Sequence, residues 1–142
     1  MFELSELVRP YFEHAGWVPR HLSSMLPVSS REKALALLNE FGGLKVGSVG
    51  PGADMSKSDI NFYAHFKPGT KDLLRSWERQ IGEVEAVATA HHDHMIIYVG
   101  VQSFYVFTDP DDKLYDLGPN FSQAMEKLLL GLHYGTSMNC DG

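Results

Sequence analysis

The sequence predicts an α+β protein: a mostly antiparallel sheet of about five to six strands packed against N-terminal helices, with an inserted helix and a C-terminal helix. Apolar residues recur at helical spacing near both ends of the chain, and short alternating segments lie between them. The later strand segments follow one another too closely for crossover helices, so they must pair antiparallel. The length of 142 residues suits a single domain over 1–142.

The first helix is predicted over residues 2–15, where apolar side chains recur every three or four positions. Pro10 lies inside this pattern and has no backbone N–H to donate, so the helix is either kinked or begins just before Pro10. Gly16 ends the helix, and the two prolines in residues 17–28 indicate a loop.

The second helix is predicted to begin after Ser29, because Ser29 followed by Glu32 is a capping-box pattern. An apolar face follows as far as Phe41. Gly42 and Gly43 then stop the helix, since glycine adopts positive φ without a steric penalty.

The strand block begins after this glycine pair. Its clearest member runs from Ile60 to Phe66, where apolar and polar residues alternate as in a half-buried strand. The residues between it and the strand before it, 50–59, contain two glycines and a proline and indicate a mobile loop. Strands are expected at residues 44–49, 60–66, 84–90, 95–100, 103–108 and 113–116.

Two more helices complete the pattern. Thr70 is expected to cap an inserted helix over residues 71–81, and Asn120 with Gln123 starts the last helix. Residues 135–142 are expected to form a mobile tail. Apolar residues at helical spacing form the two inner faces: Leu73, Leu74, Trp77 and Ile81 in the inserted helix, and Ala124, Met125, Leu128, Leu129 and Leu132 in the last.

The charge balance is acidic, with a net charge of −6. This disfavours direct binding to nucleic acid, because a protein that follows a phosphate backbone has a basic footprint. An acidic surface suits a basic protein partner, since opposite fields accelerate association. A second explanation, that the charge only keeps the protein soluble, stays open.

The compartment is predicted to be cytoplasmic. Cys140 is the only cysteine, so no internal disulfide points to an oxidising environment. The N-terminal residues are acidic and lack the long apolar run of a signal peptide. The longest strongly apolar run, Met95 to Val99, is far shorter than the ~20 residues that span a bilayer, so no membrane contact is expected.

The most distinctive polar run is His91, His92, Asp93 and His94. Imidazole and carboxylate groups together suit zinc or a similar transition metal. The spacing matches neither a helical His-Glu-x-x-His site nor a paired-cysteine site. The run is therefore a weak candidate for a metal site, and the alternative is a solvated turn between two strands. No cofactor is expected.

Four acidic residues surround the predicted hairpin turn near the end of the strand block: Asp109, Asp111, Asp112 and Asp116. They lack the frame of a calcium-binding EF-hand, and aspartate and proline are typical of turns. The turn can also form part of an acidic contact surface. Tyr63 and Tyr98 are candidate interface anchors if their side chains point outward.

The sequence contains no complete motif of a known catalytic or nucleotide-binding site. The glycines near residue 50 have the wrong spacing for a dinucleotide-binding loop. The chain has no Gly-x-Ser-x-Gly elbow, and Cys140 lies in the predicted tail, where no rigid surroundings could lower its pKa. The sequence therefore predicts a protein that is not an enzyme.

Several motifs taken together resemble the third subgroup of the SUKH superfamily of bacterial immunity proteins. They occur in the family's order and cover nearly the whole chain. The matching segments are Ala15-Gly16-Trp17-Val18-Pro19-Arg20, residues 37–46 with Gly42-Gly43-Leu44, the helix end from Trp77 to Gly82, the strand from Phe104 to Thr108, and the closing helix from Phe121 to Gly131.

The resemblance implies a protein that binds and neutralises a cognate domain of a polymorphic toxin, often a nuclease or a nucleic-acid deaminase. It also implies structural roles for the motif residues Gly16, Trp17, Arg20, Gly42 and Gly43. Trp17 is expected to pack the first helix on the sheet. A general interaction module of the same fold, and a small metal-dependent enzyme using His91–His94, are the alternatives. The oligomeric state stays open, since an edge strand at 44–49 or 113–116 could pair with another chain.

Overall fold

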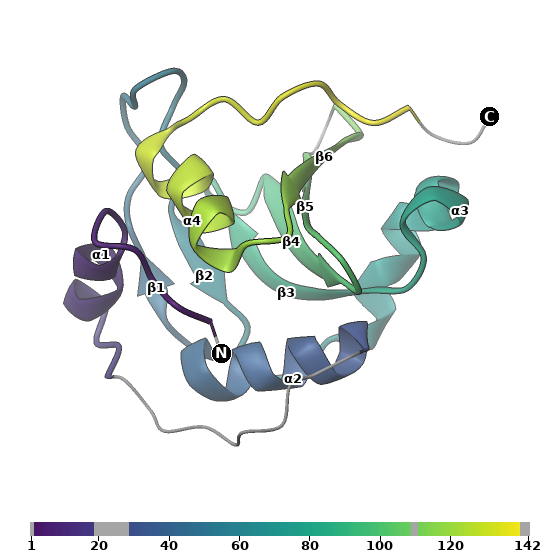
Figure 1. Cartoon of the computed structure of the whole chain (residues 1–142), viewed down its shortest axis with the longest axis horizontal. Helices are drawn as coiled ribbons and strands as arrows, with labels where there is room; N and C mark the ends of the chain where they lie inside the picture. The colour runs from purple at the N-terminus through teal and green to yellow at the C-terminus, as the bar shows by residue number, and fades with distance from the viewer. Residues whose placement is uncertain (1, 19–28, 109–110, 140–142) are drawn as a thin grey trace.

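The computed structural model describes residues 2–18, 29–108 and 111–139, and its fold is α+β, as predicted. Its centre is a six-stranded antiparallel sheet in which the strands lie in chain order (Figure 1). The strands are β1 (Lys45–Val46), β2 (Ile60–Phe62), β3 (Val84–Ala90), β4 (Met95–Gly100), β5 (Phe104–Thr108) and β6 (Lys113–Gly118). The helices are α1 (Arg9–His14), α2 (Ser30–Phe41), the 3-10 helix η1 (Pro68–Trp77), α3 (Glu78–Ile81) and α4 (Phe121–Leu130).

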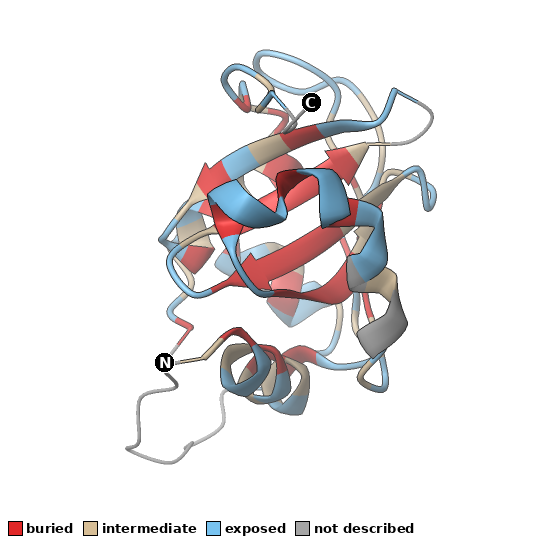
Figure 2. Cartoon of the chain, turned by 90° about the vertical axis from the view of Figure 1, so that its right-hand side faces the viewer, coloured by how far each residue is buried: buried red, intermediate tan, exposed pale blue. Residues whose placement is uncertain are grey.

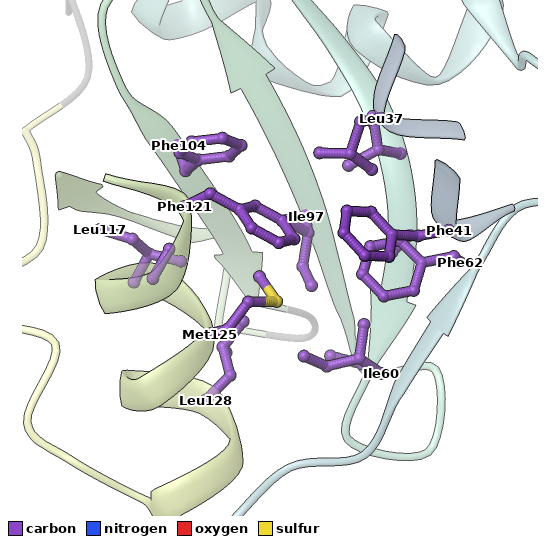
Figure 3. Close-up of a cluster of buried hydrophobic side chains, with 14 of the residues drawn as sticks. Leu37, Phe41, Ile60, Phe62, Ile97, Phe104, Leu117, Phe121, Met125 and Leu128 are labelled. Carbon is purple, nitrogen blue, oxygen red and sulfur yellow. The ribbon is translucent and has the colours of Figure 1, made fainter. Parts of the chain in front are cut away.

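Helices cover both faces of the sheet. Buried side chains of α1, α2 and α4 form the larger core with the first face. Figure 3 shows this cluster, in which the Phe41 ring stacks on Phe121 with 5.1 Å between the ring centroids. Leu74 and Trp77 of η1 and Ile81 of α3 form a smaller core with the second face. Figure 2 shows the buried side of this helical segment turned toward the sheet.

The helix boundaries follow the predicted caps. Helix α1 begins at Arg9 with Pro10 in its first turn, which is the second of the two predicted alternatives. The Ser29 hydroxyl accepts a hydrogen bond from the Glu32 backbone N–H at 3.1 Å and caps α2. The Asn120 carboxamide oxygen accepts one from the Gln123 N–H at 2.9 Å and caps α4.

The inserted helix differs from its prediction. It is a 3-10 helix from Pro68 to Trp77, and no side chain caps it, so the predicted cap at Thr70 is wrong. Leu73 is 51% exposed, which corrects its assignment to the inner face. A 3-10 helix has three residues per turn, so Leu74 and Trp77 lie one above the other on the buried side while Leu73 turns outward.

The two strands nearest the N-terminus are shorter than predicted. Strand β2 ends at Phe62, and the next residue already leaves the ladder, although the Tyr63 N–H still donates to the Val87 carbonyl at 3.0 Å. Ala64 is exposed, so the predicted common face from Ile60 to Phe66 breaks there. The cause is the approach to η1, because the chain must turn away from the sheet to cross its second face.

The edges of the sheet are β1 and β6, as predicted. A bridge covers part of β6, because the Met138 N–H donates to the Leu114 carbonyl at 2.7 Å. The Trp77 indole N–H donates to the Met138 carbonyl at 3.0 Å. Met138 of the predicted tail is thus hydrogen-bonded to β6 and to Trp77, and Cys140 lies outside the described residues. Among the described segments, no helix is long and apolar enough to cross a membrane.

Candidate functional site

Two features that are separate in the sequence meet at one end of the sheet. The turn His91–His94 joins β3 to β4, and Asp111 and Asp112 belong to the turn that joins β5 to β6. The strand register places Met95 opposite Thr108, and Thr108 opposite Lys113, so the two turns lie side by side. We call His91–His94 together with Asp111 and Asp112 the turn-end surface.

The backbone of the turn-end surface is strained. Within the described ranges, every non-glycine residue with positive φ lies on it: His91 at 52°, His92 at 54°, Asp93 at 67° and Asp112 at 52°. This conformation costs a residue with a side chain roughly 1–2 kcal/mol. Such strain persists only where the surrounding structure holds it, and it is concentrated at functional sites.

Hydrogen bonds hold the strained turn, including one across the turn itself from the His94 N–H to the His91 carbonyl at 3.2 Å. Asp59 accepts two more, from the His91 N–H to its carbonyl at 3.1 Å and from the His92 N–H to its carboxylate at 2.9 Å. The Thr89 hydroxyl donates to the Asp93 carboxylate at 2.6 Å. These contacts present the exposed side chains of His92, Asp93 and His94 on a rigid frame.

The strain predicts a gain in stability when it is removed. His92→Gly is expected to raise the free energy of unfolding by about 0.5–1 kcal/mol, because glycine adopts positive φ freely. Urea denaturation measures the change. Asp93→Gly serves as the comparison, since it relieves the same strain but also removes the hydrogen bond with Thr89, and its gain should be smaller. A destabilised His92→Gly variant would show that the turn is not strained at this position.

The side chains of the histidine turn were the weak candidate for a metal site. In the part of the chain that the structure describes, no three His, Cys, Asp or Glu side chains are placed to hold a metal ion. The His91 and His92 ring centroids lie 6.3 Å apart, with their planes tilted by 55°. His91 instead lies with its Nδ1 3.3 Å from the Ser58 hydroxyl. The turn matches the alternative prediction of a polar connection between two strands.

A cavity of about 450 Å³ lies behind the turn-end surface. His91, His94 and Asp111 line it, so the structure brings the histidine turn and the acidic turn into one hollow. The remaining lining residues come from the sheet, from the residues after α4 and from the segment before β2: Met95, Thr108, Tyr115, Tyr134 and Met55.

The wall of this cavity is aromatic. The rings of Tyr115 and Tyr134 meet edge to face with their centroids 5.5 Å apart. Tyr134 is only 5% exposed, and burial is the main cause that raises the pKa of its hydroxyl. A hydrogen bond with Ser58 lowers that pKa in turn, and the Tyr134 hydroxyl also lies 4.0 Å from the Met95 sulfur.

The two tyrosines predicted as interface anchors have different positions. Tyr63 is half-buried, with the Lys67 ammonium 4.5 Å from its ring centroid. Burial raises its pKa, and the negative charge of Asp93 adds to the effect. Tyr98 is fully buried and its hydroxyl donates to the Thr70 carbonyl at 2.8 Å. Tyr98 therefore does not meet the condition of an outward side chain, because η1 covers this part of the sheet.

The acidic residues predicted as contacts do not form one cluster. Asp111 and Asp112 are exposed on the turn-end surface. Asp116 pairs with Tyr105, which points into the smaller core, so it belongs to the second face of the sheet. Its carboxylate accepts a hydrogen bond from the Gly118 N–H at 2.8 Å. Asp109 lies outside the described residues.

The motif residues that the structure describes lie at the ends of α1 and α2. The Trp17 indole N–H donates to the Glu40 carboxylate at 3.0 Å, and the ring stacks on Phe41 of α2. Trp17 thus joins the end of α1 to α2. At Gly42, an added Cβ would lie 2.4 Å from the Leu38 carbonyl oxygen. Gly16 and Gly43 have φ of 102° and 84°, and Arg20 lies outside the described residues.

The buried tyrosines predict a loss of stability at alkaline pH. An unfolded tyrosine ionises near pH 10. Burial raises the pKa of Tyr98 in the folded state, with a contribution from Tyr63, so the unfolded chain releases its proton first. The free energy of unfolding is then constant below about pH 10 and falls as the pH rises further. Urea denaturation between pH 8 and 11 measures this slope.

The contribution of Tyr98 to this alkaline loss of stability can be measured with one variant. Tyr98→Phe removes the ionising group and should make the slope shallower. The slope should persist in part, because burial also raises the pKa of Tyr63, Tyr105 and Tyr134. An unchanged slope in Tyr98→Phe would show that this hydroxyl is not protected from ionisation.

The cavity wall was not predicted from the sequence, although one signal was available. Four strands paired consecutively must place alternate turns at the same end of the sheet. That rule alone brings residues 91–94 next to residues 109–112. Tyr115, Tyr134 and Met55 gave no comparable signal, because their positions depend on how the segments around α4 pack.

Residues 4–131 match the sequence model of a protein family that is described as SUKH-3 immunity protein. No curated protein matches the chain, and no solved structure does. The matched range contains all six strands and the whole turn-end surface.

Proposed function

The chain belongs to the SUKH-3 immunity protein family, and on this premise we propose that it binds and neutralises one cognate toxin domain. The family match over residues 4–131 carries the proposal. The toxin is a nuclease or a nucleic-acid deaminase, the classes that the resemblance implies. Neutralisation is stoichiometric binding and needs no catalytic turnover by the immunity protein.

The charge of the chain supports this class of toxin. A domain that acts on nucleic acid must bind phosphate groups and is commonly basic. The net charge of −6 would attract such a domain and accelerate its capture, an advantage when each free toxin molecule is harmful. An acidic partner can also cover a basic active-site cleft directly.

We place the contact on the turn-end surface. Its side chains His92, Asp93, His94, Asp111 and Asp112 are all exposed. Because hydrogen bonds already hold the histidine turn, binding there would order little additional backbone and would lose little entropy. Two other candidates, Tyr63 and Asp116, lie toward the second face and would contact a toxin that extends around the sheet. Asp109 stays a candidate from the sequence alone.

Co-expression with a toxin domain encoded beside the gene tests the proposal. Wild-type protein should rescue growth, and purified protein should form a one-to-one complex whose affinity falls as salt rises. Growth rescue without any complex would refute neutralisation by binding. Recovery of several unrelated proteins and no toxin in a pull-down would favour a general interaction module.

A charge reversal tests the contact surface. Asp111→Lys is expected to weaken toxin binding by about tenfold or more, because it places a like charge against a basic partner. Asp72→Lys on η1 is the matched control, since Asp72 is exposed and the change in net charge is the same. Calorimetric titration measures both affinities. Equal losses in the two variants would mean that only the overall charge matters and would refute the assigned surface.

A further inference from the structure

We infer that the cavity behind the turn-end surface receives the guanidinium group of one arginine side chain of the toxin domain. This inference rests on the proposed function and specifies its central contact. Arginine is enriched at the energetically dominant positions of interfaces, where its side chain enters a pocket on the partner. At about 450 Å³, the cavity lies within the ~300–1,000 Å³ range of small-ligand sites.

The chemistry of the wall suits a planar cation. Tyr115 and Tyr134 contribute aromatic rings that meet edge to face at 5.5 Å, and Met55 and Met95 contribute polarisable thioethers. A guanidinium group stacks on an aromatic face through both its charge and its flat shape. An ammonium group offers the charge without the flat surface, so the wall favours arginine over lysine.

A carboxylate completes the site. Asp111 lines the cavity and is exposed, so its two oxygens are available for the parallel hydrogen bonds that arginine forms with carboxylates. Among the described residues that line the cavity, none is lysine or arginine. Lys113 lies opposite the lining residue Thr108 in the strand register, but it is exposed and does not line the cavity. Asp111 therefore offers its negative charge to a cation of the partner.

The site is also organised in advance. The Tyr134 hydroxyl lies 4.0 Å from the Met95 sulfur, and the neighbouring Ser58 hydroxyl lowers its pKa. Ser58 is itself fully buried and also contacts the His91 ring. One buried hydroxyl therefore links the aromatic wall to the strained turn, and a side chain that enters the cavity meets a wall that needs little rearrangement.

A pair of small probes tests the cavity without any toxin. N-acetyl-arginine methylamide, titrated into the full chain, should shift the NMR signals of His94, Asp111 and Tyr115. The neutral analogue N-acetyl-citrulline methylamide, nearly identical in shape, should bind at least about tenfold more weakly. Asp111→Asn should reduce the arginine affinity about threefold, while Asp72→Asn should leave it unchanged. Equal binding of the two probes, or shifts confined to other residues, would overturn the inference.

The same variants in the toxin complex separate this inference from the proposed function. Asp111→Asn and Tyr115→Leu should each weaken toxin binding about threefold to tenfold. The double variant should lose less toxin affinity than the product of the two single fold-losses, because both residues contact the same arginine side chain. If wild-type protein binds no toxin, the proposed function fails. If it binds and both variants bind equally well, only the arginine contact is refuted.

Discussion

Replacing Phe41 with alanine is expected to lower the free energy of unfolding by about 3–5 kcal/mol. The Phe41 ring is fully buried between α2 and α4. Its centroid lies 5.1 Å from that of Phe121, 5.2 Å from that of Phe12 and 5.6 Å from that of Phe62. Alanine would leave a cavity that four different elements border, and their packing cannot collapse into it without moving the sheet or a helix.

Urea denaturation followed by circular dichroism measures this loss. Leu35→Ala is the control on the same helix, because Leu35 is 48% exposed, and it should change the free energy by no more than about 0.5 kcal/mol. Phe41→Leu should lose less than Phe41→Ala, since it retains much of the buried volume. A loss below about 1.5 kcal/mol for Phe41→Ala would contradict the central position of this ring.

Replacing Gly131 with alanine is expected to cost about 2–4 kcal/mol, although only one methyl group is added. Gly131 ends α4 with φ of 69°, a conformation that penalises a side chain. An added Cβ would lie 2.2 Å from the Met55 carbonyl oxygen and 2.8 Å from the Gly52 Cα. Both obstacles are backbone atoms, so a change of rotamer cannot relieve the overlap.

This substitution should also disturb the cavity. The segment from 50 to 58 is attached to the end of α4, where the Met55 N–H donates to the Gly131 carbonyl and the Ser58 N–H to the Leu128 carbonyl, each at 2.8 Å. Met55 lines the cavity, and Ser58 contacts His91. Displacing this segment should therefore loosen the histidine turn as well.

Hydrogen exchange locates the effect, and urea denaturation measures its size. In Gly131→Ala, the amides of Met55 and Ser58 should exchange faster than in the wild type. Gly50→Ala is the matched control, because an added Cβ there meets no atom within 4 Å, and it should change stability by no more than about 0.5 kcal/mol. If both alanine variants were equally stable, the backbone of Gly131 would not lie as close to Gly52 and Met55 as the structure shows.

Local signals in the sequence predicted most of the fold correctly. The caps at Ser29 and Asn120 were predicted correctly because they are local. In each, the side chain accepts a hydrogen bond from a backbone N–H only three residues further along the chain. The strands from Val84 to Gly118 were found because apolar patterning and short turns left only antiparallel pairing. The family resemblance used short ordered motifs, and the match over residues 4–131 confirms it.

The errors share a dependence on distant neighbours. The segment 50–59 was predicted to be mobile from its glycines and proline, whereas it is attached to α4 by backbone hydrogen bonds. Tyr98 was a candidate interface anchor if its side chain pointed outward, whereas η1 covers it. Met138, in the segment predicted as a tail, bridges to β6. In each of these contacts the two bonded residues lie more than twenty positions apart in the sequence.

The sequence by itself determined which elements form, that the later strands pair antiparallel and which family the chain belongs to, because these depend on local spacing and short-range turns. Only the tertiary structure decided that the histidine turn and the acidic turn share one cavity, that the histidine turn is strained, and that Tyr115 and Tyr134 line its wall. Those properties arise where segments distant along the chain come within a few ångströms, and their positions follow from the packing of the whole core.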